Sequence, residues 1–317
     1  MNILKIRDLG EGNSQTYLLV KDITGKTARN GKPYVLVTMT DGKDSIQANM
    51  WDMSAPEFPV SAGEVVFVTL RVAPYNGKTS YTIERARALN ISDPVSPADF
   101  VKSAPVASEE LFDRCMEIVS RYMTDEELIR LVRTVFADNR IALLHASAAK
   151  SVHHNGVGEL LWHVYRMALT APRIADVYKL NKDLLVAGAL LHDIGKLKEL
   201  TTDAMGITSY TVDGNLFGHL MMGAEMVEEY GRQCGTSPEK LRALKHIIVS
   251  HHGSLEFGAI AQPAIPEAYA VYILDTLDSR LYIYNNEIEK LEKGQISERI
   301  HFLDGASVWN CDINAGM

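Results

Sequence analysis

The feature that most constrains the fold of this chain is an apolar run, Leu184–Leu191, that ends in His192 and Asp193. A run of this kind predicts a buried element. A charged pair at its inner end is costly to bury unless something compensates it. Neutral imidazole and carboxylate together suit a divalent cation. The sequence therefore predicts a buried metal site at His192 and Asp193.

Further candidate ligands lie in or beside helical patterns on both sides of this pair. His163 follows an apolar pair of leucines, which places it near a buried stripe. Asp275 follows the apolar run Tyr269–Leu274, so its carboxylate also needs a partner. His219 and His251 lie between them in the sequence. A single histidine on an apolar face is usually a core residue, but the whole set favours metal binding.

The N-terminal 92 residues consist of β-forming segments separated by turns, the pattern of a small β-barrel. Segments rich in β-formers, such as Tyr34–Thr40 and Val65–Val72, are separated by turn-forming pairs such as Asn30-Gly31 and Asn76-Gly77. A series of short strands joined by hairpins predicts a barrel over residues 1–92.

After the barrel the pattern becomes helical. Residues 93–150 combine a proline-rich linker with helical segments, and residues 151–317 form the second predicted domain. The expected fold class is multidomain α and β, with an all-α C-terminal domain. Three local features are also expected: a helix end at Gly195, a capping box over Thr124–Glu127, and a short hairpin between Leu200 and Leu216.

Charge and cysteine content limit the function classes. The formal net charge of −8 excludes a generic basic nucleic-acid binder. Residues 1–92 hold 11 basic and 9 acidic side chains, a net of +2, so the remainder carries −10. Cys115, Cys234 and Cys311 show no CxxC spacing, which argues for a reducing compartment and against a zinc knuckle. With no signal peptide or membrane span expected, the predicted location is the cytoplasm, without a membrane partner.

The ordered set His163, His192-Asp193 and Asp275 resembles the H…HD…D signature of the HD phosphohydrolase superfamily, over about residues 150–290. His219 and His251 resemble the second-site histidines of its binuclear members. The resemblance implies metal-dependent phosphoester hydrolysis with one or two ions.

Two other histidines are candidates for contacts at the second site or with a phosphate. His154, nine residues before His163, is interpreted either in this way or as a loop histidine. His252 follows His251 directly and is a candidate of the same kind.

The chemistry of the ligand set narrows the cofactor and the roles. Oxygen and imidazole ligands suit Mn²⁺, Mg²⁺ or Fe, with Co²⁺ a further candidate, better than structural Zn²⁺. Asp193 is expected to orient or deprotonate the attacking water. Lys196 is expected to meet a phosphate oxygen, with a solvated helix-end lysine as the alternative.

The segment Gly25–Asp52 resembles the first strands of an OB-fold of the nucleic-acid-binding kind. Such domains bind single strands by aromatic stacking and a basic groove. The alternative is that Tyr34 and Trp51 are core residues, which is favoured for Trp51. The candidate nucleic-acid contacts are Tyr34, Trp51, Tyr75, Tyr81, Lys32 and Lys78.

An OB-fold followed by a helical linker and an HD domain resembles the YhaM-type 3′→5′ exoribonucleases. The matching motifs are AKSVHHNGVGELLWH, LLHDIGK, GHLMMG, SHHG and DTLDSR, together with the OB segment. The resemblance implies hydrolysis of single-stranded RNA, and of single-stranded DNA as an open alternative, from the 3′ end to nucleoside 5′-monophosphates. It also implies a preference for Mn²⁺ and a homo-oligomer.

Two other functions stay open at the level of the sequence. The first is an HD-type nucleotidase or phosphodiesterase that acts on small nucleotides. The second is a non-catalytic nucleic-acid-binding regulator, against which the intact ligand set argues. The absence of a GYP tripeptide after His251-His252 counts against a cyclic-dinucleotide phosphodiesterase.

Overall fold

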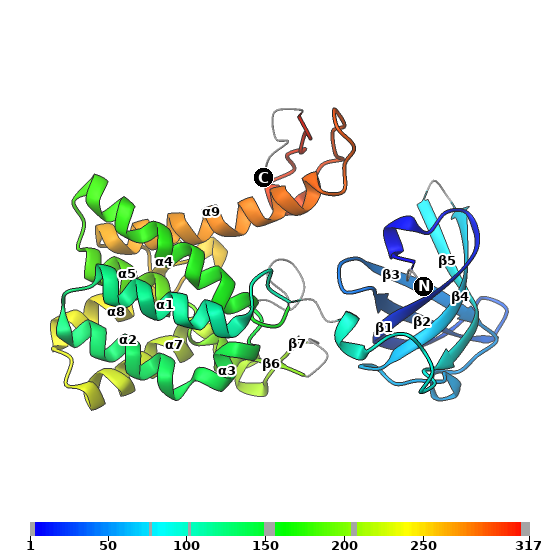
Figure 1. The fold of residues 1–317 in the computed structure, drawn as a ribbon, viewed down its shortest axis with the longest axis horizontal. Helices are drawn as coiled ribbons and strands as arrows, with labels where there is room; N and C mark the ends of the chain where they lie inside the picture. Colours follow the sequence, from blue (N-terminus) through cyan, green and yellow to red (C-terminus); the bar gives the residue numbers. More distant parts are fainter. Residues whose placement is uncertain (1–3, 76–77, 101–102, 149–155, 204–207, 312–317) are drawn as a thin grey trace. The chain divides into compact units, whose positions relative to one another are not determined.

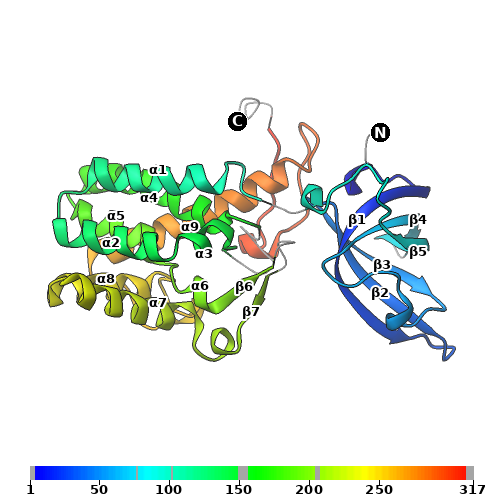
Figure 2. The same cartoon turned by 60° about the horizontal axis from the view of Figure 1, so that its bottom comes forward.

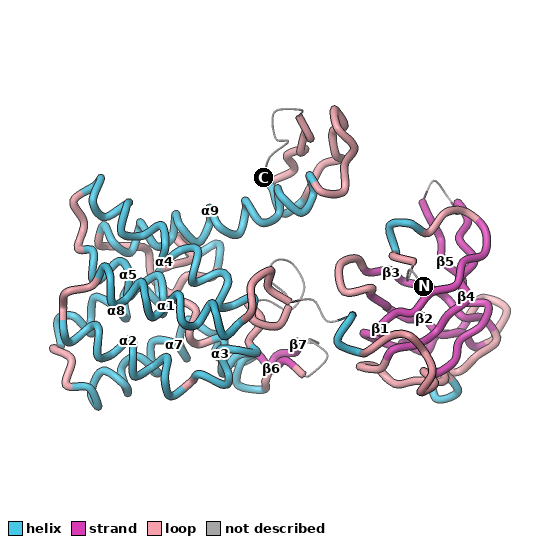
Figure 3. The backbone as a smooth tube through the Cα atoms, in the orientation of Figure 1, coloured by secondary structure: helices cyan, strands magenta, loops and turns pink. Residues whose placement is uncertain are grey.

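The computed structural model describes residues 4–75, 78–100, 103–148, 156–203 and 208–311 of the 317-residue chain. The chain divides into two compact units (Figure 1). The first comprises Met1–Lys102, with residues 203–207 grouped with it, and the second comprises Ser103–Thr202 with Thr208–Met317. Figure 3 shows that the first unit is built of strands and the second mainly of helices.

The described part of the first unit is a closed barrel in the strand order β1-β2-β3-β5-β4. This is the arrangement of an OB-fold, as the sequence predicted. The parallel pairing of β3 with β5, at Ala48 and Tyr81, closes it. The strands are β1 (Gly12–Thr27), β2 (Pro33–Thr40), β3 (Ser45–Trp51), β4 (Val65–Tyr75) and β5 (Lys78–Ala88).

Strand β2 shows the alternation expected of a barrel strand. In β2, Val35, Val37 and Met39 are fully buried, and the residues between them are partly exposed. Gly31 and Gly42, in the turns that flank β2, have φ angles of 82° and 93°. These left-handed conformations suit glycine, which explains the Asn-Gly and Asp-Gly pairs at these turns.

The second unit packs its helices around one large apolar core. Figure 2 shows α4, α5 and α9 with α7 and α8 in this bundle, and each of these helices contacts at least two others. The helices are α1 (Ser108–Tyr122), α2 (Glu126–Asp138), α3 (Arg140–His145), α4 (Glu159–Tyr178), α5 (Lys182–Leu191), α6 (Lys196–Glu199), α7 (Val212–Cys234), α8 (Pro238–Ser250) and α9 (Pro266–Ile288). Helices α1 to α3, from the segment 93–150, contribute side chains to the same core.

Helix α5 is the buried element that the apolar run predicted, because Leu184–Leu191 is buried along its whole length. The helix end expected at Gly195 is wrong. Helix α5 ends at Leu191, and the chain continues through tight turns in which Leu191 O accepts from Ile194 N at 3.1 Å. Gly195 has a right-handed φ of −62°, so it is no left-handed cap.

Two other local features are settled by the structure. The hairpin is present as β6 (Leu200–Thr202) paired with β7 (Thr208–Tyr210). The capping box over Thr124–Glu127 is wrong, because Asp125 caps α2 through Glu127 N and Leu128 N. Thr124 N donates instead to Asp183.

Among the described residues, Cys115, Cys234 and Cys311 are free thiols, and the cytoplasmic location inferred from them stays a prediction. None of the described helices has both the length and the apolarity needed to cross a bilayer.

Candidate metal centre

The carboxylate of Asp193 lies at the centre of the candidate ligands. Its Oδ2 is 3.4 Å from His192 Nε2 and 3.7 Å from His163 Nε2. Its Oδ1 is 3.5 Å from His219 Nε2 and 3.6 Å from His251 Nε2. Each oxygen therefore faces a different pair of imidazoles, and all five side chains are almost fully buried.

Five separate elements bring these side chains together. His163 lies on α4, His192 and Asp193 follow α5, His219 lies on α7, and His251 caps the end of α8. Asp275 reaches the same place from α9. Its Oδ1 is 3.4 Å from His163 Nε2, which is itself 3.2 Å from His192 Nε2.

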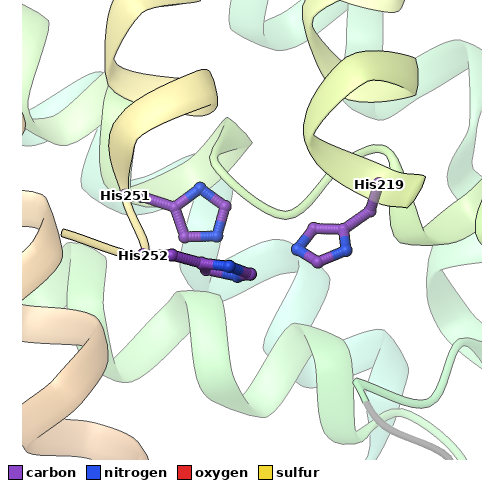
Figure 4. Close-up of side chains that lie close together, drawn as sticks. All are labelled: His219, His251 and His252. Carbon is purple, nitrogen blue, oxygen red and sulfur yellow. The ribbon is translucent and has the colours of Figure 1, made fainter. Parts of the chain in front are cut away.

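The candidate ligands form two separate triads, and a third, overlapping group of His192, Asp193 and His251 connects them; in each group the ligand atoms lie within 4.8 Å of one another. The first is His163, His192 and Asp275; the second is His219, His251 and His252. In Figure 4, His219 approaches from one ribbon segment, and His251 and His252 approach from another. The ring centroids of His219 and His252 are 5.1 Å apart. Asp193 lies between the triads and can contribute an oxygen to each.

The Nδ1 atom of every histidine in the two triads is held by an oxygen. Since a backbone carbonyl only accepts, an Nδ1–H facing one must donate, which leaves the Nε2 lone pair for a metal ion. Carboxylates hold the other two rings in the same way. The five contacts are His163 to Asp278 Oδ2 at 2.8 Å, His192 to Ala189 O at 3.1 Å, His219 to Glu199 Oε1 at 3.0 Å, His251 to Ile248 O at 2.8 Å, and His252 to Phe257 O at 3.0 Å.

Two buried polar atoms of this centre lack a hydrogen-bond partner among the described residues. Asp193 Oδ1 and His219 Nε2 are buried without a hydrogen bond, and they lie 3.5 Å apart. A buried polar atom without a partner costs about 1–3 kcal/mol. A divalent cation between these atoms removes that cost, so the donor set fits a metal ion.

The charge of the centre is concentrated on Asp193. Burial disfavours its ionised form, but Lys196 and the nearby imidazoles of His192 and His219 outweigh burial and hold the pKa of the Asp193 carboxyl well below its usual range. Lys196 Nζ donates to Asp193 Oδ2 at 2.7 Å. This pairing raises the pKa of Lys196 against the effect of its burial. Lys196 is therefore a partly buried, ion-paired cation at the site and not a solvated helix-end lysine.

The two triads differ in how they hold protons. Burial lowers the pKa of His251 and of His252, so both rings are neutral, as metal ligands must be. Burial also opposes a charge on His163, but Asp275 and Asp278 outweigh it and raise the pKa of His163 to about 10. The same carboxylates that attract a proton attract a divalent cation.

Sequence reasoning missed two carboxylates that orient the rings. Asp278 accepts from His163 Nδ1 and pairs with Arg166 Nη2 at 2.7 Å. Glu199 accepts from both the backbone N and the Nδ1 of His219. Asp278 follows Asp275 by nearly one helical turn within the DTLDSR motif, and this spacing was a usable signal.

Two glycines allow the chain to approach His219 closely. A Cβ on Gly195 would lie 2.0 Å from His219 O, so a side chain there would separate α6 from α7. Gly218, just before His219, has φ 72° and ψ 161°, a conformation that essentially only glycine adopts. Gly195 therefore serves close packing, and not the cap that the sequence predicted.

The remaining predicted residues are placed as follows. His252 belongs to the second triad and is partly buried. His154 lies outside the described residues. In the barrel, the rings of Tyr34 and Trp51 are 4.8 Å apart. Trp51 is 50% exposed, so the core interpretation favoured for it is wrong.

The other predicted barrel contacts differ in exposure. Tyr75 is 69% exposed, whereas Tyr81 is partly buried against the barrel core. Lys32 Nζ pairs with Asp52 at 2.8 Å. Lys78 begins β5, but its side chain is outside the described part of the structure.

Comparison with known proteins places this constellation in a family. Residues 160–280 match the HD domain family. The chain is 31% identical over 308 residues to the 3′-5′ exoribonuclease YhaM of Bacillus subtilis, with 96% of this chain and 97% of that protein covered. The chain belongs to the YhaM 3′-5′ exoribonuclease family. YhaM of Bacillus velezensis is 32% identical over 311 residues, with 96% and 97% covered.

The YhaM match extends over both units, so it includes the barrel as well as the metal centre. A search of solved structures finds the second OB-fold domain of replication protein A from Methanococcus maripaludis, at 17% identity and a TM-score of 0.23. That match covers 29% of this chain and 97% of the other.

Proposed function

We propose that this protein is a metal-dependent 3′→5′ exonuclease that degrades single-stranded RNA to nucleoside 5′-monophosphates. The observation that carries the proposal is the convergence of four Nε2 atoms on the two oxygens of Asp193, with each Nδ1 held from outside. The family resemblance gives the 3′→5′ direction and the RNA substrate. Single-stranded DNA is the second substrate to test.

We propose that two divalent ions bind, one at each triad, with Asp193 shared between them. The separate imidazole pairs that face its two oxygens support this count over a single ion. Mn²⁺ is the proposed metal, because mixed imidazole and carboxylate ligands suit it and the family resemblance implies it. When bound, the ions lower the pKa of a water molecule and neutralise charge on the phosphoryl oxygens.

The chain's own groups position the substrate around that centre. Asp193 orients the attacking water. Lys196, partly buried beside Asp193 with its charge intact, places one cation where a phosphate oxygen can meet it. His154, from outside the described residues, is proposed as a further phosphate or metal contact.

We propose that the barrel binds the single strand by base stacking. Trp51 and Tyr34 form a partly exposed aromatic pair on adjacent strands, and Tyr75 exposes most of its ring. Aromatic faces stack with all four bases, which suits an enzyme that must move through any sequence. Lys32 and Lys78 are proposed as phosphate contacts, and Tyr81 as a lesser, partly buried one.

Self-association is also proposed, and one face of α9 supports it. Tyr269, Ile273, Leu277 and Leu281 follow one another at four-residue spacing and are between 41% and 58% exposed. Such spacing places them on one helical stripe. Ile273 and Leu281 are equally far from Leu277, so an antiparallel copy of α9 can pair them across a twofold axis.

The proposed activity is tested with full-length protein, Mn²⁺ and 5′-labelled single-stranded RNA. Stepwise shortening from the 3′ end is expected, and Asp193→Ala should abolish it. Asp304→Ala, a change to an exposed carboxylate in the same unit, should leave the rate unchanged. Labelled RNA that survives while mononucleotides lose phosphate would overturn the exonuclease in favour of a nucleotidase.

A further inference from the structure

Two exposed phenylalanines lie close in the chain to histidines of the second triad. Phe217 is 52% exposed and lies two residues before His219. Phe257 is 66% exposed, and its carbonyl oxygen accepts from His252 Nδ1 at 3.0 Å. Because the rings of His219 and His252 are only 5.1 Å apart, the backbone segments that carry the two phenylalanines meet at the same small site.

The neighbours of these phenylalanines extend the apolar surface. Leu216 is 68% exposed and Leu255 is 63% exposed. We call Leu216, Phe217, Leu255 and Phe257 the apolar rim. Exposed apolar side chains that gather beside a centre of charged and imidazole groups point to a binding surface. None of the four side chains carries a hydrogen-bonding group.

The backbone on both sides of the rim is fixed by contacts of the triad. Glu199 accepts from the backbone N of His219 at 3.1 Å, next to the constrained Gly218 that follows Phe217. On the other side, Gly258 after Phe257 has a φ of 88°. Figure 4 shows that the two histidines belong to different segments. Leu216 and Phe217 lie in α7, and Leu255 and Phe257 lie in the short helix after α8, so the rim has residues on both segments. The hydrogen bonds that orient His219 and His252 therefore also hold the backbone of the apolar rim.

We propose that the apolar rim is a nucleobase-stacking subsite for the 3′-terminal nucleotide, whose phosphate lies at the metal centre. This subsite rests on the proposed exonuclease function, and it explains how the enzyme holds the terminal base. A π face is common to every base, so apolar walls hold the terminal nucleotide without reading its identity. A strand of any sequence can then be shortened residue by residue.

The test compares two RNA substrates that differ in a single base. One has a normal 3′-terminal nucleotide and the other has an abasic ribonucleotide at that position. Phe257→Ala is expected to lower kcat/KM on the normal RNA by about 5- to 150-fold, the effect of losing one base stack. On the abasic RNA the same variant should match the wild type. Phe257→Trp should restore activity on the normal RNA, and Phe217→Ala should behave like Phe257→Ala.

Phe302→Ala is the matched control, because Phe302 is 56% exposed and lies beyond α9 in the short helix His301–Leu303. It should leave both substrates unaffected. Equal loss on normal and abasic RNA, or no loss on either, would overturn the subsite. A fall in melting temperature in Phe257→Ala with unchanged kcat/KM would overturn it too, and would indicate that the rim packs against protein. If wild-type protein shortens neither RNA, the exonuclease proposal itself fails.

Discussion

Asp278 Oδ2 accepts a hydrogen bond from His163 Nδ1 at 2.8 Å, although the two residues are 115 positions apart. The same oxygen pairs with Arg166 Nη2 at 2.7 Å. Helix α9 therefore supplies both Asp275, which faces Nε2 of the ring, and the carboxylate that holds its opposite side. Partners of this kind fix the tautomer and the orientation of a metal-binding ring.

Replacing Asp278 with Asn should lower the metal affinity of the first triad without leaving a cavity. The amide keeps the size of the carboxylate but loses the charge that orients His163. Loss of such a partner lowers metal affinity or activity by about 10- to 100-fold. Titration of the metal-free protein with Mn²⁺ measures the affinity. Asp304→Asn is the control, since Asp304 forms an exposed pair with Arg280 in the same unit. Wild-type Mn²⁺ affinity in Asp278→Asn would contradict the role.

The number of ions is tested by removing one triad at a time. His219→Ala should lower the bound metal from two ions per chain to one, because Asp193 and the first triad remain. Elemental analysis after dialysis gives the ratio. His246→Ala is the matched histidine control, since its ring accepts from Ala264 N outside the centre. A wild-type ratio of one ion per chain would favour the single-ion alternative.

The proton on His163 should make the metal-free protein sensitive to alkaline pH. Its pKa is raised to about 10, above the unfolded value of about 6.5. Its stabilising contribution is therefore fully present below pH 6.5 and is lost as the pH rises through 10. Melting temperatures of EDTA-treated wild type and His163→Gln should converge between pH 7 and pH 10. A gap that is constant with pH would show that the ring binds no extra proton.

The ligands were predictable from the sequence, whereas the groups that orient them were not. His163, His192, Asp193 and Asp275 each follow an apolar stretch, so burial and ligand chemistry coincide in the local sequence. Glu199 gains its role only through His219, 20 positions away, and no local pattern encodes that contact. Sequence periodicity therefore does not predict hydrogen-bond partners that only the tertiary fold brings together.

The same limit explains the barrel and the apolar rim. Alternation predicted the strands, because one face of each strand must be buried. It left Trp51 assigned to the core, since an aromatic residue at a strand end suits either face. The exposure of Phe217 and Phe257 depends on the break at Gly218 and on the loop after α8, which no helical or strand period describes.

Trp51→Ala should weaken binding of single-stranded RNA by about 5- to 150-fold, the effect of losing one stacking platform. Hydrolysis of a small phosphodiester should not change, because that reaction needs only the metal centre. Filter binding in EDTA measures the affinity without degradation. Trp309→Ala is the control, since Trp309 is 59% exposed in the second unit. Unchanged affinity in Trp51→Ala would remove the barrel pair from the binding surface.

Leu277→Glu should convert a proposed oligomer to monomers, because Leu277 is the midpoint of the exposed stripe on α9. In an antiparallel pair each Leu277 meets its own copy, so two carboxylates would be buried against each other at a cost that neither can relieve. Light scattering after size-exclusion chromatography measures the mass. Val177→Glu, at an exposed position near the end of α4, introduces the same charge elsewhere and should leave the mass unchanged. A wild type that is monomeric at all concentrations would show that the stripe does not mediate self-association, whereas an oligomer that persists in Leu277→Glu would place the interface on another face.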